Sequence, residues 1–249
     1  MIHLQNLYKK FDDQYVLNDL NMTLEQGKCN VVIGQSGSGK TVLMKSIVGL
    51  LEVDAGEILY DDRDFTRMGK RKKQMLRKEM GMLFQGGALF DSITIEENVM
   101  FPLNMFTNDT YNSKLKRVDF CLERVGLKEV NKLMTSELSG GMRKRAAIAR
   151  AIALSPKYLF CDEPNSGLDP KTAIRIDNLI SEITKEYNIT TLVNSHDMNS
   201  VLEIGDKVIY IYQGCKCWEG TKEEVMHTDN EALNNFVFAT KMAQQIKKI

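Results

Sequence analysis

The chain carries Gly34-Gln35-Ser36-Gly37-Ser38-Gly39-Lys40-Thr41 between an apolar segment, residues 29–33, and a segment of helical period, residues 41–50. The three glycines let the backbone turn tightly, so that its N–H groups can point at phosphate oxygens from a helix N-terminus. Lys40 supplies a mobile positive charge for the β- and γ-phosphates, and the Thr41 hydroxyl is placed to ligate Mg²⁺. Because strand, glycine loop and helix follow the order that a phosphate loop requires, the sequence predicts an α/β protein that binds a nucleoside triphosphate.

Apolar alternation and helical periodicity place further elements along the chain. Short strands are predicted at residues 2–7, 15–20, 29–33, 56–60, 80–85, 158–161, 189–194, 207–212 and 215–219. The first three alternate like an antiparallel edge. The composition from about residue 86 to residue 140 indicates a mostly helical insertion, and a long helix is predicted over residues 170–187. This order of elements favours a parallel-sheet α/β layout.

The bulk composition restricts the function classes. A chain of 249 residues is long for one domain and short for two, so one domain with a subdivision is expected. Lysine plus arginine and aspartate plus glutamate both total 33. This balance argues against a protein that mainly binds nucleic acid, which usually needs a basic face.

Membrane and redox signals are weak. No apolar run approaches the roughly 18–20 residues needed to cross a bilayer, and the N-terminus lacks a secretory signal. We therefore expect a cytosolic protein whose membrane role, if any, comes from a partner. Five scattered cysteines do not predict a disulfide framework. Cys215 and Cys217 are explained more simply as alternate residues of a strand than as half of a metal site.

Asp162 and Glu163 follow four mainly apolar residues of a predicted strand. Such a strand delivers both carboxylates to the carboxyl end of a sheet, where ligands bind in open α/β folds. We expect Asp162 to hold Mg²⁺ through water and Glu163 to face the attacking water as a base or polariser. A solvated acidic pair is the alternative interpretation, and the phosphate loop favours the functional one.

A second glycine-rich segment, Leu138-Ser139-Gly140-Gly141-Met142, precedes a predicted helix over residues 143–154. A serine and two glycines at a helix start form a second anion-binding nest. One chain does not need two nests for one nucleotide, whereas a head-to-tail dimer does, because each nest closes on the γ-phosphate held by the other chain. The alternative is an N-capped helix with flexible glycines.

In combination, these motifs resemble the ABC ATPase family over essentially the whole chain. They are the glycine loop, Gln85 after a strand, Leu-Ser-Gly-Gly, Asp-Glu, Ser166-Gly167-Leu168-Asp169, and His196 in Asn-Ser-His-Asp. The resemblance implies a P-loop NTPase core with an N-terminal antiparallel β subdomain and a helical insertion.

The same resemblance implies a single ABC ATPase domain over residues 1–249. Its catalytic core with the β subdomain would comprise residues 1–85 and 157–220. The helical subdomain with the signature motif would span residues 86–156, and a short C-terminal helical tail would span residues 221–249.

ATP and Mg²⁺ are the ligands that the family implies. Phe11 looks like the aromatic residue that stacks on adenine, with Tyr8 and Tyr15 as fallbacks. The remaining implied nucleotide contacts are Gly34, Gln35, Ser36, Gly37, Ser38, Gly39, Lys40, Thr41, Ser139, Gly140, Gly141 and Asp169. The implied metal ligands are Thr41, Gln85 and Asp162.

The catalytic residues that the resemblance implies are Glu163, His196, Gln85 and Lys40. Gln85 would contact Mg²⁺ and the attacking water while sensing a membrane partner. His196 would bridge the γ-phosphate to the opposite chain, and Asp169 would lie across the dimer. The other two histidines, His3 and His227, are interpreted as surface or packing residues.

Two short segments indicate which subgroup of the ABC ATPase family the chain resembles. Met142 stands where glutamine commonly ends the signature, which would weaken contacts to ribose, and residues 82–90 read Met-Leu-Phe-Gln-Gly-Gly-Ala-Leu-Phe. Together they resemble the ATPase of Mla-type, MCE-associated systems that move phospholipids between bacterial envelope membranes.

The partners implied by this resemblance are a second copy of the chain, an integral membrane permease and an MCE-type lipid-binding protein, with no nucleic acid. The permease would dock near residues 86–106, where apolar residues suggest an exposed groove. The subunit would be cytoplasmic and peripheral on the inner membrane. The basic stretch at residues 67–78 reads most simply as a solvated helix face, with contact to anionic lipid headgroups as the alternative.

Three rival functions are considered. An ABC ATPase could serve another cargo, such as amino acids, ions or lipoproteins. A soluble ABC protein of translation or DNA repair would use two modules in one chain or a long coiled-coil insertion. A simple P-loop kinase or GTPase would leave the nest at residues 139–141 and His196 without a function.

Overall fold

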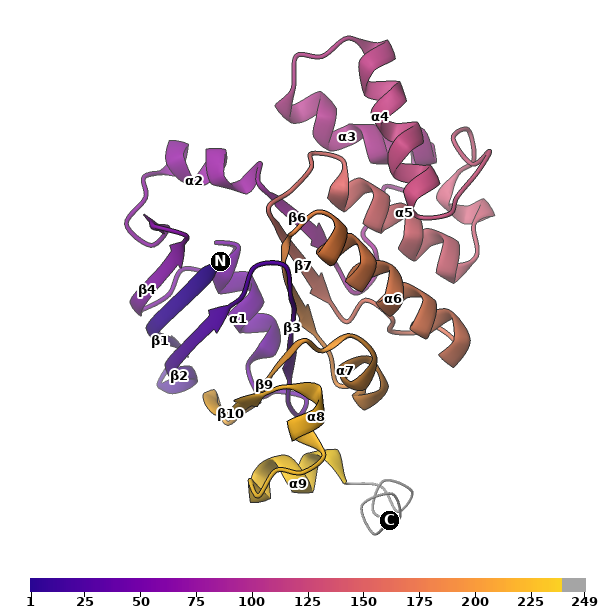
Figure 1. Ribbon diagram of the computed structural model, residues 1–249. Helices are drawn as coiled ribbons and strands as arrows, with labels where there is room; N and C mark the ends of the chain where they lie inside the picture. Colours follow the sequence, from indigo (N-terminus) through magenta and orange to yellow (C-terminus); the bar gives the residue numbers. More distant parts are fainter. Residues whose placement is uncertain (239–249) are drawn as a thin grey trace.

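The structure, a computed structural model that describes residues 1–238, contains two β-sheets with helices around them and a helical lobe to one side (Figure 1). This arrangement confirms the predicted α/β fold with an N-terminal antiparallel sheet and a helical insertion. The predicted helical tail, residues 221–249, lies partly outside the described residues.

The smaller sheet is antiparallel. In spatial order its strands are β2 (Gln14–Leu24), β1 (Ile2–Phe11), β4 (Ala55–Tyr60) and β5 (Arg63–Asp64). β1 and β2 are longer than predicted, because they continue past their apolar segments into a tight hairpin. That hairpin turns at Asp12, whose φ of 50° is in the left-handed region that aspartate tolerates.

The larger sheet is parallel except at one edge. In spatial order its strands are β10 (Cys215–Gly220), β9 (Lys207–Tyr212), β3 (Cys29–Ile33), β8 (Thr190–Asn194), β7 (Tyr158–Asp162) and β6 (Met80–Leu83). Only β10 runs antiparallel to its neighbour. The antiparallel placement predicted for residues 29–33 is therefore wrong, since β3 lies parallel between β8 and β9. All five of its residues are buried, as expected for a central strand covered on both faces.

Ten helical segments accompany the sheets within the described part of the chain. They are α1 (Lys40–Ile47), α2 (Lys70–Arg77), α3 (Ile95–Phe106), α4 (Tyr111–Arg124), the short 3₁₀ helix η1 (Thr135–Glu137), α5 (Gly140–Ile152), α6 (Pro170–Glu186), α7 (Met198–Ile204), α8 (Lys222–Val225) and α9 (Glu231–Val237). α5 begins earlier than predicted, because Ser139 caps it and both following glycines adopt helical geometry.

Two apolar cores hold the layers together. Val32 packs with α1 and the smaller sheet on one face of the larger sheet. Its neighbours Val31 and Ile33 pack on the other face, in the core that includes residues of α5, α6 and α7. This alternation fixes the end of β3, and hence the glycine loop, between two packed layers. Among residues 1–238, no helix has both the length and the apolar character needed to cross a bilayer.

Candidate functional site

The glycine loop connects the end of β3 to the start of α1. Gly39 is the N-cap of α1 with φ 103°, and a Cβ there would lie 2.7 Å from the carbonyl oxygen of Val16. Gly37 has φ 81°. Both positions therefore favour glycine. Gly39 has a left-handed backbone and no room for a Cβ, whereas Gly37 has a left-handed backbone alone. The loop brings the first backbone N–H groups of α1 to the carboxyl edge of the parallel sheet.

Lys40 lies across this loop and is only 8% exposed. Its Nζ donates to the carbonyl oxygens of Gly34 at 2.7 Å and Gln35 at 3.0 Å. Burial lowers the pKa of the ammonium below its usual value, and the carboxylates of Glu163 and Asp162 oppose that effect. The cation is thus confined between the loop and the acidic pair.

The Ser38 hydroxyl is buried in the same loop, and its Oγ has no hydrogen-bond partner among the described residues. A buried hydroxyl without a partner costs free energy. A phosphate oxygen would satisfy it, while Lys40 and the N–H groups of α1 supply complementary charge. The residues of this loop therefore fit a bound polyphosphate.

Asp162 ends β7 beside the start of α1. The Asn194 side chain, at the end of β8, donates to Asp162 Oδ1 at 3.0 Å and to the Lys40 carbonyl oxygen at 3.1 Å. A single buried amide thus ties together the ends of two strands and the phosphate loop. The oxygens of Asp162 and Thr41 are of the kind that Mg²⁺ takes together with phosphate oxygens and water, so the donor set fits this ion.

Glu163 has a left-handed backbone, with φ 49°. This costly conformation for a glutamate is held by a hydrogen bond from its N–H to the Asn194 carbonyl oxygen at 3.0 Å. The side chain is only 13% exposed, and its Oε2 lies 2.8 Å from Nδ1 of the exposed His196. Two of the four residues predicted to be catalytic, Glu163 and His196, are therefore in direct contact.

Gln85 follows β6 and approaches the same edge of the sheet. Its side chain donates to the Ser166 hydroxyl at 3.3 Å. Its backbone carbonyl accepts a hydrogen bond from Nζ of Lys144, a residue of α5 that is 7% exposed. Burial lowers the pKa of Lys144. Sequence reasoning missed Lys144, because a lysine between two arginines looks like a solvated face.

The loop after Gln85 is fastened on two sides. Arg150 of α5 donates to the carbonyl oxygens of Gly87 and Ala88, both at 2.8 Å. The fully buried Asn98 of α3 accepts from the N–H of Phe90 at 2.8 Å and donates to its carbonyl oxygen at 3.0 Å. The loop after Gln85 is therefore attached to two helices of the helical lobe, α5 and α3, and should move together with them.

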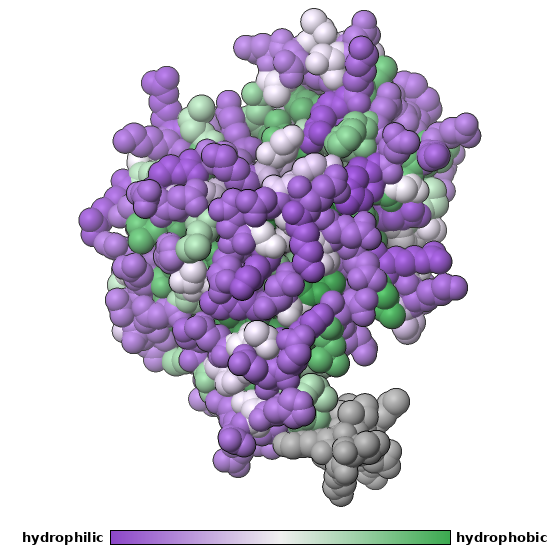
Figure 2. Space-filling model, viewed as in Figure 1, coloured by the Kyte–Doolittle hydropathy of each residue, from purple (hydrophilic) through white to green (hydrophobic). Residues whose placement is uncertain are grey.

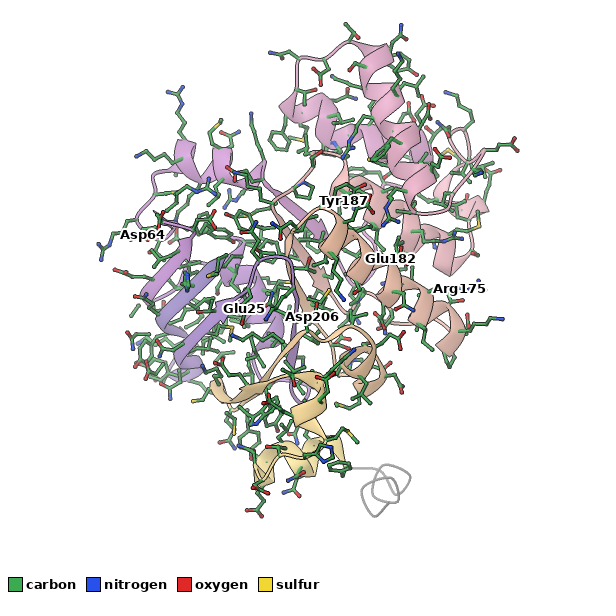
Figure 3. The ribbon with its side chains drawn as sticks, viewed as in Figure 1. Glu25, Asp64, Arg175, Glu182, Tyr187 and Asp206 are labelled. Atoms are coloured by element: carbon green, nitrogen blue, oxygen red, sulfur yellow. The ribbon has the colours of Figure 1, made fainter. Side chains whose placement is uncertain are left out.

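The second predicted nest begins α5. Ser139 Oγ accepts from the N–H of Met142 at 3.3 Å, as an N-cap does. Asp169 caps α6 in the same way, accepting from the Thr172 N–H at 3.0 Å. A hollow of about 640 Å³ lies between these two helix starts and extends along α6, whose Arg175 and Glu182 are labelled in Figure 3.

No residue of the glycine loop lines this hollow. Ser139, Gly140, Gly141 and Asp169 thus form one group, and the residues around Lys40, Gln85, Asp162, Glu163 and His196 form another. The predicted nucleotide contacts therefore lie in two separate groups on one chain, here called the two half-sites.

The aromatic residues expected near adenine lie at the β1–β2 hairpin. Phe11 is 45% exposed with Lys9 Nζ 5.5 Å from its ring centre, and Tyr15 is 53% exposed. Tyr15 precedes Val16, whose carbonyl faces Gly39 of the phosphate loop. Its ring contacts that of Tyr8 edge-on, with 5.9 Å between centres. The assignment of Phe11 remains a prediction.

A buried polar cluster behind the site was not predicted. Asn165 donates to Asp177 Oδ2 at 3.2 Å and to the Ser200 hydroxyl at 2.6 Å. Burial is the main cause that raises the pKa of Asp177, to about 6. The cluster joins the segment before Asp169 to α7, which follows His196. The sequence gives no clear signal for it, because Asp177 lies within a helix of ordinary amphipathic pattern.

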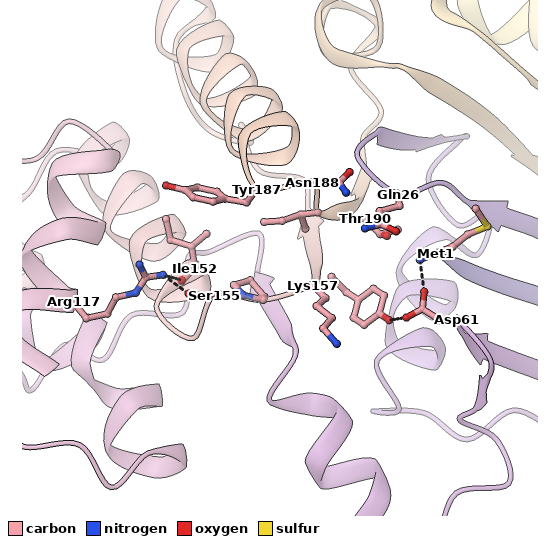
Figure 4. A pocket seen from close by; sticks show the side chains of 13 residues that line it. Met1, Gln26, Asp61, Arg117, Ile152, Ser155, Lys157, Tyr187, Asn188 and Thr190 are labelled. Atoms are coloured by element: carbon pink, nitrogen blue, oxygen red, sulfur yellow. Dashed lines mark hydrogen bonds and ion pairs between the residues drawn. The ribbon is translucent and has the colours of Figure 1, made fainter. Parts of the chain in front are cut away.

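A cavity of about 360 Å³ lies at the amino-terminal ends of β7 and β8, away from both half-sites (Figure 4). The Met1 amine bonds to Asp61 at 2.7 Å, and Arg117 binds carbonyl oxygens at the end of α5. These charged groups are already paired within the fold.

Three comparisons with known proteins agree with this geometry. A family model described as "ABC transporter" matches residues 17–166. The intermembrane phospholipid transport system ATP-binding protein MlaF of Haemophilus influenzae is 41% identical, over 95% of this chain and 90% of its own length. The methionine import ATP-binding protein MetN of Campylobacter jejuni is 35% identical, over 95% of this chain and 75% of its own.

Among solved structures, a dimeric ATP-binding cassette in a post-hydrolysis state bound to ADP and Pi superimposes with a TM-score of 0.81. Its sequence is 29% identical, and the match covers 89% of this chain and 99% of that one.

Proposed function

This chain belongs to the ABC transporter family and is an ATP-hydrolysing transport subunit, and from that premise we propose that it drives phospholipid movement between bacterial envelope membranes. In this proposal two copies close around two MgATP and drive a separate permease. The observation that carries the cargo assignment is the similarity to MlaF, and the presence of two separate half-sites on one chain supports the closure of two copies.

The phosphate loop would bind the triphosphate. Lys40 would exchange its two carbonyl contacts for β- and γ-phosphate oxygens, and Ser38 would gain the partner that its hydroxyl lacks. When bound, Mg²⁺ would neutralise phosphate charge between Thr41, Gln85 and Asp162. Phe11, or Tyr15 from the same hairpin, would stack on the adenine ring.

Catalysis would consist of positioning and charge neutralisation around the γ-phosphate. Glu163 would orient and deprotonate the attacking water. His196 would turn from the Glu163 carboxylate towards the γ-phosphate, and Gln85 would help to place the water. The strained backbone of Glu163 supports this role, because such strain is concentrated at functional sites.

The second copy would complete each site. Ser139, Gly140 and Gly141 would approach the γ-phosphate held by the partner's phosphate loop, using the N-terminus of α5 as an anion nest. Asp169 would lie across the interface beside them. The similar dimeric cassette bound to ADP and Pi supports this arrangement.

The permease would dock on an apolar face of the helical lobe. Phe90 is 42% exposed, Phe101 39% and Met105 60%, and the rings of Phe90 and Phe101 lie 4.8 Å apart. A cluster of exposed large apolar side chains is typical of an interaction surface. Since Arg150 and Asn98 fasten this face to the loop after Gln85, docking there would reach the catalytic site directly.

Phospholipid is the proposed cargo because of the similarity to MlaF, and an MCE-type lipid-binding protein is the proposed companion. Another cargo, such as an amino acid, is the second candidate, favoured by the similarity to MetN. The subunit would lie at the cytoplasmic face of the inner membrane, where it would be bound to its permease. We propose no nucleic-acid partner.

Affinity purification of the tagged chain from detergent-solubilised membranes tests this assignment. We expect a permease and an MCE-type lipid-binding protein to co-purify, with phospholipid in the complex. Co-purification with a permease and an amino-acid-binding protein would overturn the phospholipid assignment in favour of the second candidate. Recovery without any permease would overturn the transport role itself.

A further inference from the structure

The segment around α2 is a strongly basic part of the described chain that the catalytic scheme leaves unused. Residues 67–78 contain seven basic residues and no acidic one, in a chain whose formal net charge is zero. The seven, here called the α2 basic surface, are Arg67, Lys70, Arg71, Lys72, Lys73, Arg77 and Lys78. Such a local excess needs its own explanation.

Part of this surface serves the fold. Arg67 pairs with Asp64 at 3.2 Å, on the strand edge labelled in Figure 3. Arg77 donates to the Gly49 carbonyl oxygen at 2.7 Å, after the end of α1. Lys73 lies over the ring of Phe65, with 5.1 Å to its centre.

The first turn of α2 has no such role. Lys70, Arg71 and Lys72 are exposed, and none has a hydrogen bond or ion pair from its side chain to another described residue. Cations at a helix N-terminus face the positive end of the helix dipole, which is unfavourable. The first turn holds no acidic residue that would offset them. These three charges therefore do not stabilise the folded chain.

The same surface includes an apolar element. Met75 is 56% exposed, and with Met68 and Leu76 it lines a shallow groove between the basic side chains. Hydrophilic residues otherwise dominate the upper left of Figure 2, where Figure 1 places α2. Exposed cations with a flexible apolar side chain among them are typical of segments that lie at a membrane interface.

The α2 basic surface adjoins the apolar face of the helical lobe. Lys78 Nζ lies 5.5 Å from the ring centre of Phe106, the last residue of α3. α2 and α3 both lie at the upper end of the molecule in Figure 1. If the α3 face meets a membrane-embedded permease, as the proposed function holds, the neighbouring α2 basic surface lies beside that docking face, on the side of the molecule that would approach the membrane.

We propose that the α2 basic surface binds the anionic phospholipid headgroups of the membrane, with Lys70, Arg71 and Lys72 as its principal contacts. Phosphate-bearing headgroups supply the negative charge that these side chains do not find within the protein. The overall neutrality of the chain makes nucleic acid the less suitable polyanion. The inference rests on the proposed function for its geometry, but headgroup binding does not require a permease.

Sedimentation of the full-length chain with lipid vesicles tests the proposal. One set of vesicles contains phosphatidylcholine alone and the other adds phosphatidylglycerol. Each cation near an anionic surface contributes about fivefold to binding, so three should give about 100-fold tighter binding to the anionic vesicles at low salt. Lys70→Gln with Lys72→Gln should weaken this about 25-fold, and salt should weaken it progressively.

Lys116→Gln with Lys128→Gln is the matched control, because it removes two exposed lysines without side-chain partners elsewhere in the described chain. We expect it to bind like the unchanged protein. Equal loss in both double variants, or equal binding to both kinds of vesicle, would overturn the proposal. Stronger binding to a DNA oligonucleotide than to anionic vesicles would identify a nucleic-acid surface instead.

The purification test separates this inference from the proposed function. Vesicle binding with no co-purifying permease would leave the headgroup site standing and remove the transport role. Co-purification of a permease, together with no binding of the isolated ATPase subunit to anionic vesicles, would support the transport role and overturn the headgroup site. ATPase activity in detergent should be the same for the Lys70→Gln/Lys72→Gln variant and the unchanged protein, since neither lysine contacts the nucleotide half-sites.

Discussion

Nδ1 of His196 lies 2.8 Å from Oε2 of Glu163, and the backbone of Glu163 is held in a left-handed conformation by the carbonyl oxygen of Asn194. The carboxylate that we assign to water activation is thus fixed at both its backbone and its side chain. His196 is 66% exposed on its side chain and can turn away without disturbing packed neighbours. The contact brings together two of the residues for which we propose catalytic roles.

Glu163→Gln should lower the ATP turnover rate about 100- to 10,000-fold, the usual contribution of a general base. Binding should persist, because the amide keeps the shape of the side chain, so the variant should accumulate as an ATP-bound dimer on size-exclusion chromatography. Glu123→Gln is the control, since Glu123 is exposed and its side chain has no partner in the described structure. Unchanged turnover in Glu163→Gln would exclude Glu163 as the base.

Lys40→Ala should abolish ATP binding, because it removes the buried cation that fills the phosphate loop. Equilibrium binding of a fluorescent ATP analogue measures the loss directly. Lys45→Ala, on the same helix but exposed, should bind normally. Equal affinity in the two variants would contradict the role of Lys40.

Lys144→Met should lower turnover about 10- to 100-fold while leaving the KM for ATP nearly unchanged. Lys144 donates to the backbone carbonyl of Gln85, so its loss should displace Gln85. Small misplacements at a reacting centre have effects of this size. Steady-state kinetics of Lys144→Met and Lys144→Arg test this, with partial recovery expected for arginine. A rise in KM alone would show that Lys144 acts on binding instead.

Asp177 should make stability depend on pH. Burial raises the pKa of its carboxyl from 3.8 to about 6 in the folded protein, so the folded state binds more protons than the unfolded state between these values. Stability from this residue is therefore greatest at low pH and falls as pH rises through the window. Between about pH 4.5 and 7.5 the loss should be about 2 kcal/mol.

Urea unfolding of the unchanged protein and Asp177→Asn at both pH values isolates this term, because the other carboxylates cancel in the difference. The variant, which cannot ionise at this position, should gain about 2 kcal/mol relative to the unchanged protein on going from the lower to the higher pH. A difference that stays constant with pH would show that Asp177 is already ionised in the fold.

Much of the fold could be predicted from sequence because its strands are short, apolar and bounded by turns. The predicted strand 207–212 matches β9, whereas the strand predicted to end at Gln85 stops at Leu83. The partner of a strand is less predictable: nothing local distinguishes β3, in the centre of a parallel sheet, from an edge strand. Its full burial on both faces becomes visible only in three dimensions.

The candidate site divides in the same way. Phosphate-loop and signature residues were predictable, because phosphate chemistry demands particular residue types at fixed spacing. Lys144 and Asp177 were not, since each is a charged residue on a helix of ordinary pattern, and only tertiary packing buries it. The sequence therefore indicates the groups that we propose to contact the ligand more clearly than the buried groups, such as Lys144, that hold the site in place.

The continuity of α5 has a mechanical consequence. Its 13 residues make a rod about 20 Å long, whose first turn is the signature nest and whose side chains at 144 and 150 hold the Gln85, Gly87 and Ala88 carbonyls. A helix of this length transmits displacement without bending appreciably. Under the proposed function, the loop after Gln85, next to the proposed permease-docking face, is attached along the side of α5, and the nucleotide bound by the second copy would lie at the first turn of this helix. A displacement at either place would then be transmitted along α5 to the other.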